Sequence, residues 1–535
     1  MIPAFVLRTS QNSSRFSSVL LSVVALFAIS FTTACGSSGN AAKRPPLSGN
    51  TQVTVFLSST ANDEFVEFNI GLTGISLTSQ SGKTVTLLTT PKGTQQWVEF
   101  IHVNGEIEPL ATLSVPQDVY TAANVTIGQS AFTCVTLTPA GGLDTSSFAY
   151  GTNPNNAPPT TVTVNLASPI TITGDSMGLS LDLQVVKSAS YTGCYVTGIE
   201  PYSITPTFNL TPVPFSSQPT GPQNGKAAQL DGQITAIGGN GTSFTLALPD
   251  GPRTVTISTS NSTTYQGISG FSALALGTFV DMDGATQTDG SLLASRIAVL
   301  DAAAVDVQSG PVLLIGGDPL NGETSAWVIN RLSQGQDQIP VEWPYNISAA
   351  AFQVSGQFSN LPSLPFVPAF NASNVVAGQN VYVSTLKFQV PTDPYTPAST
   401  ATLMPQTING TVLGSAQNGN FTDYAVSLAS YDLFPALAVQ QGQTTLLTNP
   451  GQVEVYVDSS TQLLNTQALA PGSTLRFYGL VFNDNGTLRM DCAQVNDGVT
   501  GTSLAGSGTN MSTGQARILR KSSGPMQQTT TIITR

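Results

Sequence analysis

Very few residues in this chain have the chemistry of an acid–base or nucleophilic catalyst. His102 is the only histidine among 535 residues, which removes most histidine-based triads, general bases and zinc sites. We expect it to be a structural side chain in a strand. Residues 174–178 read Gly-Asp-Ser-Met-Gly and fit the G-x-S-x-G pattern of serine hydrolases, with Ser176 as the nucleophile. That pattern requires a following helix, but residues 179–186 are strand-like, so we expect a turn between strands, with a serine hydrolase as the alternative.

Three acids close together in the sequence offer a second candidate site. The carboxylates of Asp281, Asp283 and Asp289 could bind calcium, which prefers clusters of oxygen ligands. Their spacing does not match the calcium loop of helix–loop–helix proteins, which also needs a distal glutamate. Asp-Gly pairs are typical of tight hairpin turns. Turn chemistry is the preferred interpretation, a calcium site is the alternative, and no cofactor is expected.

Three aromatic residues, Trp327, Trp343 and Tyr345, lie close together in the second half of the chain. Exposed aromatic rings can stack on sugars, so a carbohydrate-binding surface is one hypothesis. Aromatic rings in a small β-domain are more often part of its core, because each ring buries a large apolar area. The core interpretation is preferred here.

The N-terminus has the features of an export signal, which we assign to residues 1–34. A basic segment precedes an apolar run over residues 19–31, which is too short for a typical transmembrane helix. Small residues follow it and lead directly to Cys35. This arrangement resembles the bacterial lipoprotein signal, although Thr32 stands where leucine is usual. The alternatives are an ordinary secretory signal or a single membrane span.

The lipoprotein resemblance implies that Cys35 is acylated, for example with palmitate, and becomes the first residue of a membrane-anchored protein. Residues 35–50 are rich in glycine, serine and proline, as expected of a flexible tether. Gly36 follows the cysteine where an aspartate would signal retention in the inner membrane. By the same resemblance, we expect delivery to the outer membrane.

The other three cysteines include one candidate pair. Cys134 and Cys194 both lie in strand-like segments, and outside the cytoplasm they could form a disulfide that closes a loop of about 60 residues. The alternative is two buried free thiols. Cys492 has no obvious partner in the sequence.

The composition indicates an all-β protein with several domains. Only 9% of residues are charged, while 49 glycines and 34 prolines are spread between short apolar segments. Glycine and proline placed in this way are typical of a chain with many short strands separated by turns. The net charge of −12 argues against binding to nucleic acid, because an acidic surface repels phosphate groups. No segment after the N-terminus is apolar enough to span a bilayer.

Residues 51–213 are expected to form a β-sandwich. Residues 65–70 alternate between apolar and polar side chains, and residues 74–87 contain a hairpin with a turn at Ser81-Gly82. The order of features resembles the bacterial domain-of-unknown-function family numbered 4382. The matching segments are residues 52–57, 74–78 and 110–116, the last of which leads to Tyr120.

After a linker at residues 214–226, the sequence repeats a module of five or six short strands. The copies span residues 227–301, 308–390 and 404–499, and the middle copy is degenerate and lacks the closing Asp-Gly hairpin. A short sheet hides its edges by curling into a small barrel. The pattern resembles the domain-of-unknown-function family numbered 5666, which implies an oligonucleotide-fold-like barrel. The alternative is a set of unrelated hairpins.

Residues 500–535 lack apolar periodicity, and we expect a disordered tail. Taken together, the sequence predicts a non-catalytic cell-envelope lipoprotein that is structural, adhesive or ligand-binding. Its expected partners are the membrane, through the N-terminal lipid, and an unknown extracellular or envelope ligand. A carbohydrate-binding surface module and a serine hydrolase are the alternative functions.

Overall fold

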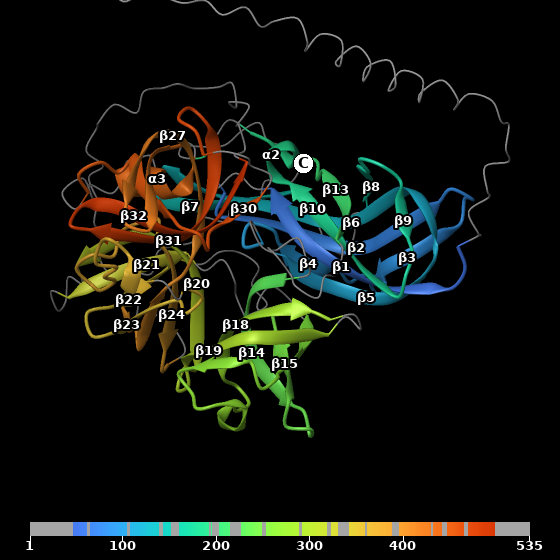
Figure 1. The fold of residues 1–535 in the computed structure, drawn as a ribbon, viewed down its shortest axis with the longest axis horizontal. Helices are drawn as coiled ribbons and strands as arrows, with labels where there is room; N and C mark the ends of the chain where they lie inside the picture. Colours follow the sequence, from blue (N-terminus) through green and yellow to red (C-terminus); the bar gives the residue numbers. More distant parts are fainter. Residues whose placement is uncertain are drawn as a thin grey trace, which may run out of the picture. The chain divides into compact units, whose positions relative to one another are not determined.

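Figure 1 shows the fold of the chain as a computed structural model. Residues 49–535 form one compact unit, to which the following description applies. The structure describes residues 47–60, 65–103, 107–137, 143–150, 160–191, 194, 203–213, 226–248, 253–287, 291–317, 323–329, 342–358, 361–387, 395–429, 432–440, 447–464 and 469–497.

Several predictions fall outside this part of the chain. They concern the signal at residues 1–34, Cys35, most of the tether and of the linker at 214–226, Asp289, and the tail at residues 500–535. Among the described residues, no helix has the length and apolar character needed to cross a membrane.

The first sheet of the N-terminal domain has four strands in the order β13-β10-β1-β5. The strand β1 lies in the middle, parallel to β10 and antiparallel to β5. Both neighbours satisfy its backbone hydrogen bonds, and most of its side chains are buried, on both faces of the sheet. The strands are β1 (Asn50–Thr60), β5 (Glu108–Pro116), β10 (Ser176–Gln184) and β13 (Phe208–Val213).

The second sheet of this domain is built on the long antiparallel pair of β2 and β6. Side chains from both sheets, such as Val55 of β1 and Ile70 of β2, share one apolar core. The expected β-sandwich is therefore confirmed. The strands are β2 (Glu67–Ser79), β3 (Thr84–Thr89), β4 (Gln96–Glu99), β6 (Asp118–Leu137), β7 (Leu143–Tyr150), β8 (Thr160–Val164) and β9 (Ile170–Ile172). A short helix, α2 (Val185–Ser188), and the pair β11 (Ala189–Ser190) and β12 (Ser203–Ile204) complete the domain.

The first repeated module is a six-stranded sheet in the order β16-β15-β14-β18-β19-β17. A short parallel contact between β16 and β19 closes this sheet into a small barrel. The long strand β14 pairs with both β15 and β18, so it links the two halves of the barrel. The strands are β14 (Lys226–Ile237), β15 (Ser243–Ala247), β16 (Thr254–Ser258), β17 (Thr264–Gln266), β18 (Phe279–Thr286) and β19 (Leu292–Asp301).

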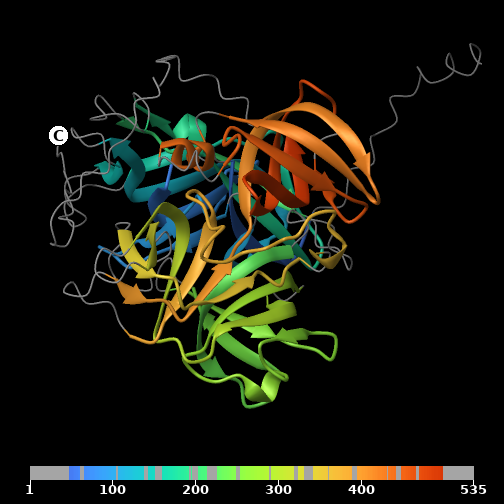
Figure 2. The same ribbon diagram turned by 90° about the vertical axis from the view of Figure 1, so that its left-hand side faces the viewer.

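The last module has the same strand order and the same kind of closure, here between β29 and β32. Figure 2 shows its orange and red strands curling around one another. A helix, α3 (Leu433–Gln440), lies between its second and third strands. The strands are β27 (Gln406–Asn418), β28 (Phe421–Leu428), β29 (Gln452–Val457), β30 (Gln462–Leu464), β31 (Thr474–Asp484) and β32 (Thr487–Asp497).

The middle module repeats this topology with seven strands in the order β23-β26-β24-β20-β21-β22-β25. Here the last long strand is split in two, so that β25 closes the barrel against β22 while β26 pairs with β24. The strands are β20 (Asp306–Gly317), β21 (Thr324–Ile329), β22 (Glu342–Asn346), β23 (Ala351–Val354), β24 (Asn380–Thr385), β25 (Thr396–Pro397) and β26 (Thr400–Leu403).

One prediction for the middle module was wrong, because the module extends to Leu403, beyond the predicted end at residue 390. As predicted, it has no closing Asp-Gly hairpin. Its last antiparallel pair, β24 and β26, is joined by a longer connection. The pairing of distant strands, rather than the turn sequence, preserves this part of the fold.

A glycine in the opening strand explains part of the repeated sequence pattern. At Gly232 a Cβ atom would lie 2.2 Å from the carbonyl oxygen of Ala247, and at Gly410 it would lie 2.6 Å from that of Ser427. A real Cβ atom does not come this close to backbone. Both strands therefore need glycine where they bend against the second strand of the barrel.

The middle and last modules share an apolar cluster. Tyr456, Leu480 and Phe482 of the last module pack with Phe366 and Phe370 of the middle module. The neighbouring residue on β31, Val481, belongs instead to the interior core of the last barrel. Since successive strand residues point to opposite faces, β31 is buried on both sides.

The hairpin between β31 and β32 provides a test of the turn chemistry. Asn485 and Gly486 both have positive φ, 51° and 92°, as a two-residue type I′ turn requires. We expect Gly486→Val to lower the free energy of unfolding by more than about 1 kcal/mol, because a β-branched residue is strained at this φ. Chemical denaturation of Gly486→Val and Gly486→Asn measures this, and equal stability of the two variants would contradict the turn assignment.

Candidate functional site

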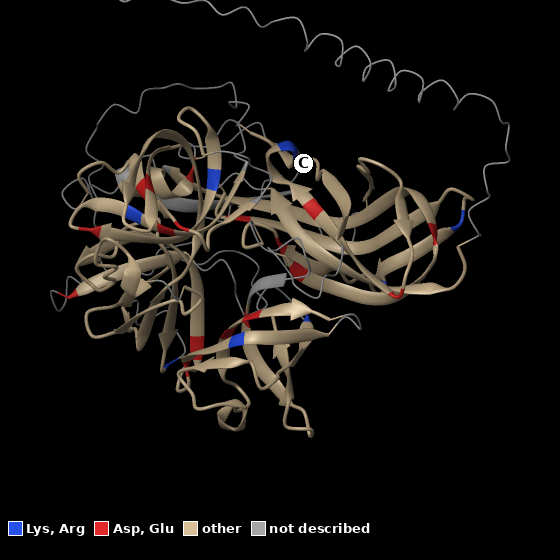
Figure 3. Ribbon diagram, in the orientation of Figure 1, with Lys and Arg blue, Asp and Glu red and all other residues tan. Residues whose placement is uncertain are grey.

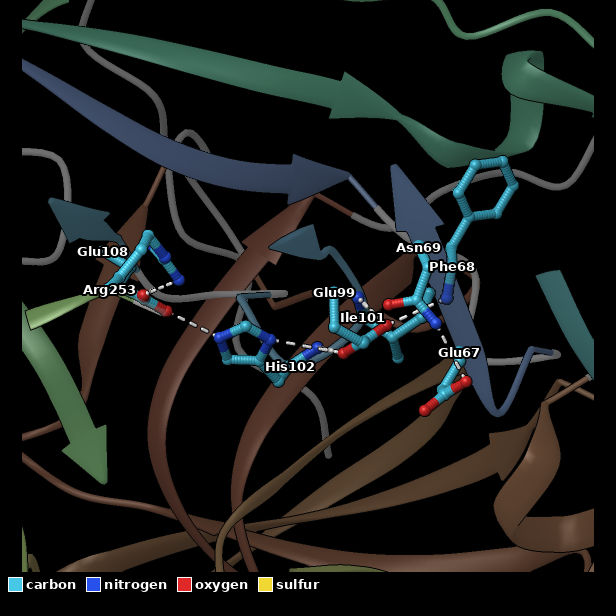
Figure 4. A network of polar contacts seen from close by, with 8 residues as sticks. All are labelled: Glu67, Phe68, Asn69, Glu99, Ile101, His102, Glu108 and Arg253. Atoms are coloured by element: carbon cyan, nitrogen blue, oxygen red, sulfur yellow. Dashed lines mark hydrogen bonds and ion pairs between the residues drawn. The ribbon is translucent and has the colours of Figure 1, made fainter. Parts of the chain in front are cut away.

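One connected group of titratable side chains surrounds His102 (Figure 4). Its Nδ1 atom lies 3.2 Å from an oxygen of Glu99, and its Nε2 atom lies 2.6 Å from an oxygen of Glu108. The second oxygen of Glu108 forms an ion pair with Arg253. Both nitrogens of the imidazole ring are therefore held by carboxylates, and this network also contains an arginine from the first barrel.

Glu99 organises the turn that carries the histidine. It ends strand β4, and its carboxylate accepts hydrogen bonds from the backbone amides of Phe68, Ile101 and His102, at 2.8 to 2.9 Å. The prediction that His102 lies within a strand was wrong, because it lies in the turn after β4. A carboxylate that satisfies three amides fixes this turn and orients the imidazole ring toward Glu108.

Glu108 connects the sandwich to the first barrel. It begins strand β5, whereas Arg253 precedes strand β16. Burial by itself would raise the pKa of Glu108, but the charge of Arg253 and the contacts with His102 outweigh it and lower the pKa. Arg253 Nη1 also donates to the carbonyl oxygen of Pro109, at 3.4 Å. The carboxylate of Glu108 is thus ionised, and it is held by His102 of the sandwich and by Arg253 of the first barrel.

This arrangement binds segments together and does not resemble a nucleophilic site. Ser176 begins strand β10, directly after a turn at Gly174, which has a φ of +79°. The residues that follow are strand, so the geometry required for a nucleophile elbow does not occur there. The imidazole of His102 already contacts two glutamates. The structure therefore has the predicted turn between strands just before Ser176.

Asp281 and Asp283 face a guanidinium group. Arg296 lies 2.8 Å from the carboxylate of Asp281 and 2.7 Å from that of Asp283, and all three residues are buried. The two acids raise the pKa of Arg296 above its usual value and offset the effect of burial. Among the described residues, no group of three or more acids, histidines or cysteines has the arrangement of a metal site.

The three aromatic residues do not form a common platform. Trp327 pairs with Pro344, whereas Trp343 pairs with Val328, so the two indoles project from opposite faces of the sheet. Trp327 packs against the sandwich core, and Trp343 packs against the cluster shared by the middle and last modules. Tyr345 is fully buried. These positions match the core interpretation of the three rings.

Cys134 and Cys194 form a disulfide, with their Cα atoms 5.4 Å apart and a separation of 60 positions in the sequence. The thiol of Cys492 is free and buried in the last barrel. Burial raises the pKa of Cys492 well above its usual value, so this thiol is unreactive.

Sequence reasoning did not identify Glu99, Glu108 or Arg253. Figure 3 shows that charged residues are sparse along the strands, and a single charge in a strand gives no spacing pattern to recognise. The available signal was the rarity of charge itself, since a charged residue within an apolar strand must find a partner when it is buried.

Comparison with known proteins identifies one part of the chain. Residues 231–298 match the model of a domain-of-unknown-function family, DUF5666. This agrees with the resemblance inferred for the first repeat, while no match to the family numbered 4382 was found. None of the curated proteins compared with the chain is similar to it.

One solved structure is described as a multidomain protein with nucleic acid binding domains from Streptococcus pneumoniae TIGR4. Its sequence is 13% identical, and the match covers 49% of this chain and 72% of that one. The TM-score is 0.09, so the likeness supports no inference about fold or function.

We predict that Glu108→Gln destabilises the protein at neutral pH by about 3 kcal/mol, because it leaves Arg253 buried without its counter-charge. The lowered pKa of Glu108 means that its stabilisation is present above the ordinary glutamate value of 4.5 and is lost as pH falls further. The difference between wild type and variant should therefore shrink below about pH 4. Denaturant titration across pH measures this, with Glu323→Gln at an exposed position as the control.

A second prediction concerns the disulfide. A digest of freshly isolated protein, analysed without reduction by mass spectrometry, should contain the peptides of Cys134 and Cys194 joined together. Reduction should separate them and lower the stability by about 4 kcal/mol, because the bond constrains a long loop in the unfolded chain. Alkylated free thiols at both positions would show that the bond does not form.

Proposed function

We propose that this chain is a non-catalytic lipoprotein of the bacterial cell envelope, anchored through an acylated Cys35, whose β-modules bind a ligand. The observation that carries the proposal is the disulfide between Cys134 and Cys194. Disulfides persist in oxidising compartments outside the cytoplasm. An exported domain is what the basic segment, apolar run and small residues before Cys35 also predict.

Among the residues that the structure describes, the candidate catalytic side chains are engaged in structural contacts, and this supports a binding role. The histidine is held between Glu99 and Glu108, and Ser176 lies at the start of a strand. The buried charges of the first module are likewise engaged in ion pairs. Such pairs fix the relative positions of strands and do not turn over a substrate. The net charge of −12 favours a ligand other than nucleic acid.

Outer-membrane delivery follows from the residue after the cysteine. Gly36 does not carry the carboxylate that would retain a lipoprotein in the inner membrane, so we place the protein in the outer membrane. Several acyl chains on one cysteine would hold it there stably, since each buried methylene contributes about 0.8 kcal/mol.

The anchor assignment predicts that Cys35→Ser moves the protein from the membrane fraction to the soluble fraction. The variant should also lose incorporation of labelled palmitate, because the acylated sulfur is gone. Ser37→Ala, two residues further along the tether, is the control and should stay membrane-bound and labelled. A Cys35→Ser protein that sediments with membranes as wild type does would exclude the lipid anchor.

A further inference from the structure

Buried charged side chains lie where the sandwich meets the first barrel. Strand β5 of the sandwich contacts strand β14 of the first barrel. Glu108 of β5 forms an ion pair with Arg253 of the barrel, and the two side chains are only 6% and 5% exposed. Arg253 also donates a hydrogen bond to the carbonyl oxygen of Pro109. Polar contacts of the sandwich with one arginine thus help to hold the barrel in place.

Apolar packing, by contrast, joins the sandwich to the other two modules. The apolar core of the sandwich includes Leu313 of the middle module and Leu437 of the last one. The core of the first barrel is separate, and its members, such as Leu230 and Ile257, all come from that barrel. Among the described residues, no apolar cluster combines the sandwich with the first barrel. The position of this barrel on the sandwich therefore depends strongly on the buried charges.

The hydrogen bonds around His102 require a doubly protonated imidazole ring, which lies between two carboxylates (Figure 4). Both oxygens of Glu99 accept backbone amide groups, so toward the ring nitrogen Nδ1 they can act only as acceptors. On the other side, the ionised carboxylate of Glu108 lies 2.6 Å from Nε2. An ionised carboxylate has no proton to donate, so each ring nitrogen must carry one. The ring is therefore an imidazolium ion in this arrangement.

The charges in this network balance only while the ring is protonated. They come from each element around the ring: Glu99 ends β4, Glu108 begins β5, and Arg253 of the first barrel lies across Glu108. With His102 protonated, two carboxylates face two cations. Loss of one proton leaves an excess negative charge in a buried site and turns a nitrogen lone pair toward a carboxylate oxygen. Both changes favour an open contact in which water solvates the charges.

We propose that protonation of His102 controls how firmly the first barrel is attached to the sandwich. The imidazolium holds Glu108 and Glu108 holds Arg253, so the barrel keeps one position while the ring carries both protons. When the pH rises and the ring loses a proton, the barrel pivots about its small apolar cluster with the middle module, which includes Leu300 and Tyr382. The sandwich, middle and last modules stay together through their shared core. This inference goes beyond the ligand-binding role and depends on neither the ligand nor the lipid anchor.

NMR spectroscopy of the purified full-length protein, labelled with ¹³C-histidine, tests the protonation state. Because His102 is the only histidine, a single ring signal reports on it. This signal should show a doubly protonated ring at about pH 7.5, where an unperturbed histidine is largely neutral, and a singly protonated ring by about pH 9.5. A ring that has already lost a proton at about pH 7.5, or one that keeps both protons to about pH 9.5, overturns the proposal.

Distances between pairs of nitroxide spin labels test the attachment of the barrel. Labels at Lys83→Cys on the sandwich and Asn261→Cys on the first barrel, both exposed positions, should give a distance distribution that at least doubles in width as the ring loses its proton. Lys83→Cys with Ser415→Cys on the last barrel is the control. Its distribution should keep its width, because those two modules share an apolar core. A first-barrel distribution that is unchanged by the titration overturns the proposal.

Two variants separate the ring from the ion pair. His102→Gln cannot become charged, so the first-barrel distribution should be broad at about pH 7.5 and should not change as the pH rises. Arg253→Gln removes the group that Glu108 holds, so its distribution should be broad at every pH, and it serves if the first variant does not fold. Glu323→Gln, at an exposed position, should behave as wild type. A folded His102→Gln or Arg253→Gln protein that keeps the pH dependence of wild type overturns the proposal.

Discussion

Each barrel in this chain depends on pairing between its own edge strands. A sheet of short strands leaves unpaired amides and carbonyls at both edges, which would invite pairing with other chains. The contacts that prevent this are short: β16 meets β19, β22 meets β25 and β29 meets β32 over two or three residue pairs each. The strands between them must therefore bend strongly. Gly232 and Gly410 permit that bend because a side chain there would collide with the neighbouring strand.

In the closed barrel, the side chains on the two faces of each strand have different environments. Inward residues such as Val455 and Met490 fill the barrel and keep its shape. Outward residues differ between copies, and they contact an apolar neighbour, as on β31, or form ion pairs, as on β18. Buried ion pairs such as Glu108 with Arg253 contribute little net stability, since desolvation offsets their attraction. Such a pair fixes the positions of the two segments that carry it, because burying the carboxylate or the guanidinium without the other is energetically costly.

Local patterns in the sequence identified the strands and several turns, but not the contacts between distant strands. Alternation predicted the sandwich, and Asn485-Gly486 marked a hairpin that the structure contains. The pairing of β24 with β26 in the middle module could not be predicted, because a long connection without a turn dipeptide joins the two strands. The opposite orientations of Trp327 and Trp343 depend on the pairing register of β21 and β22, which cannot be read from either segment alone.

The same limit applies to the sites. The alternative of a calcium site at Asp281 and Asp283 stayed open in the sequence because their partner, Arg296, comes from the next strand. Each of the two carboxylates contacts the guanidinium of Arg296, so the pair of acids is part of a buried ion-pair network. Because strand pairing constrains the inward residues most directly, outward residues such as Asp281 and Arg296 differ between copies of one barrel topology. The role of each outward group then depends on the partners that neighbouring strands supply, and these partners cannot be read from one segment of the sequence.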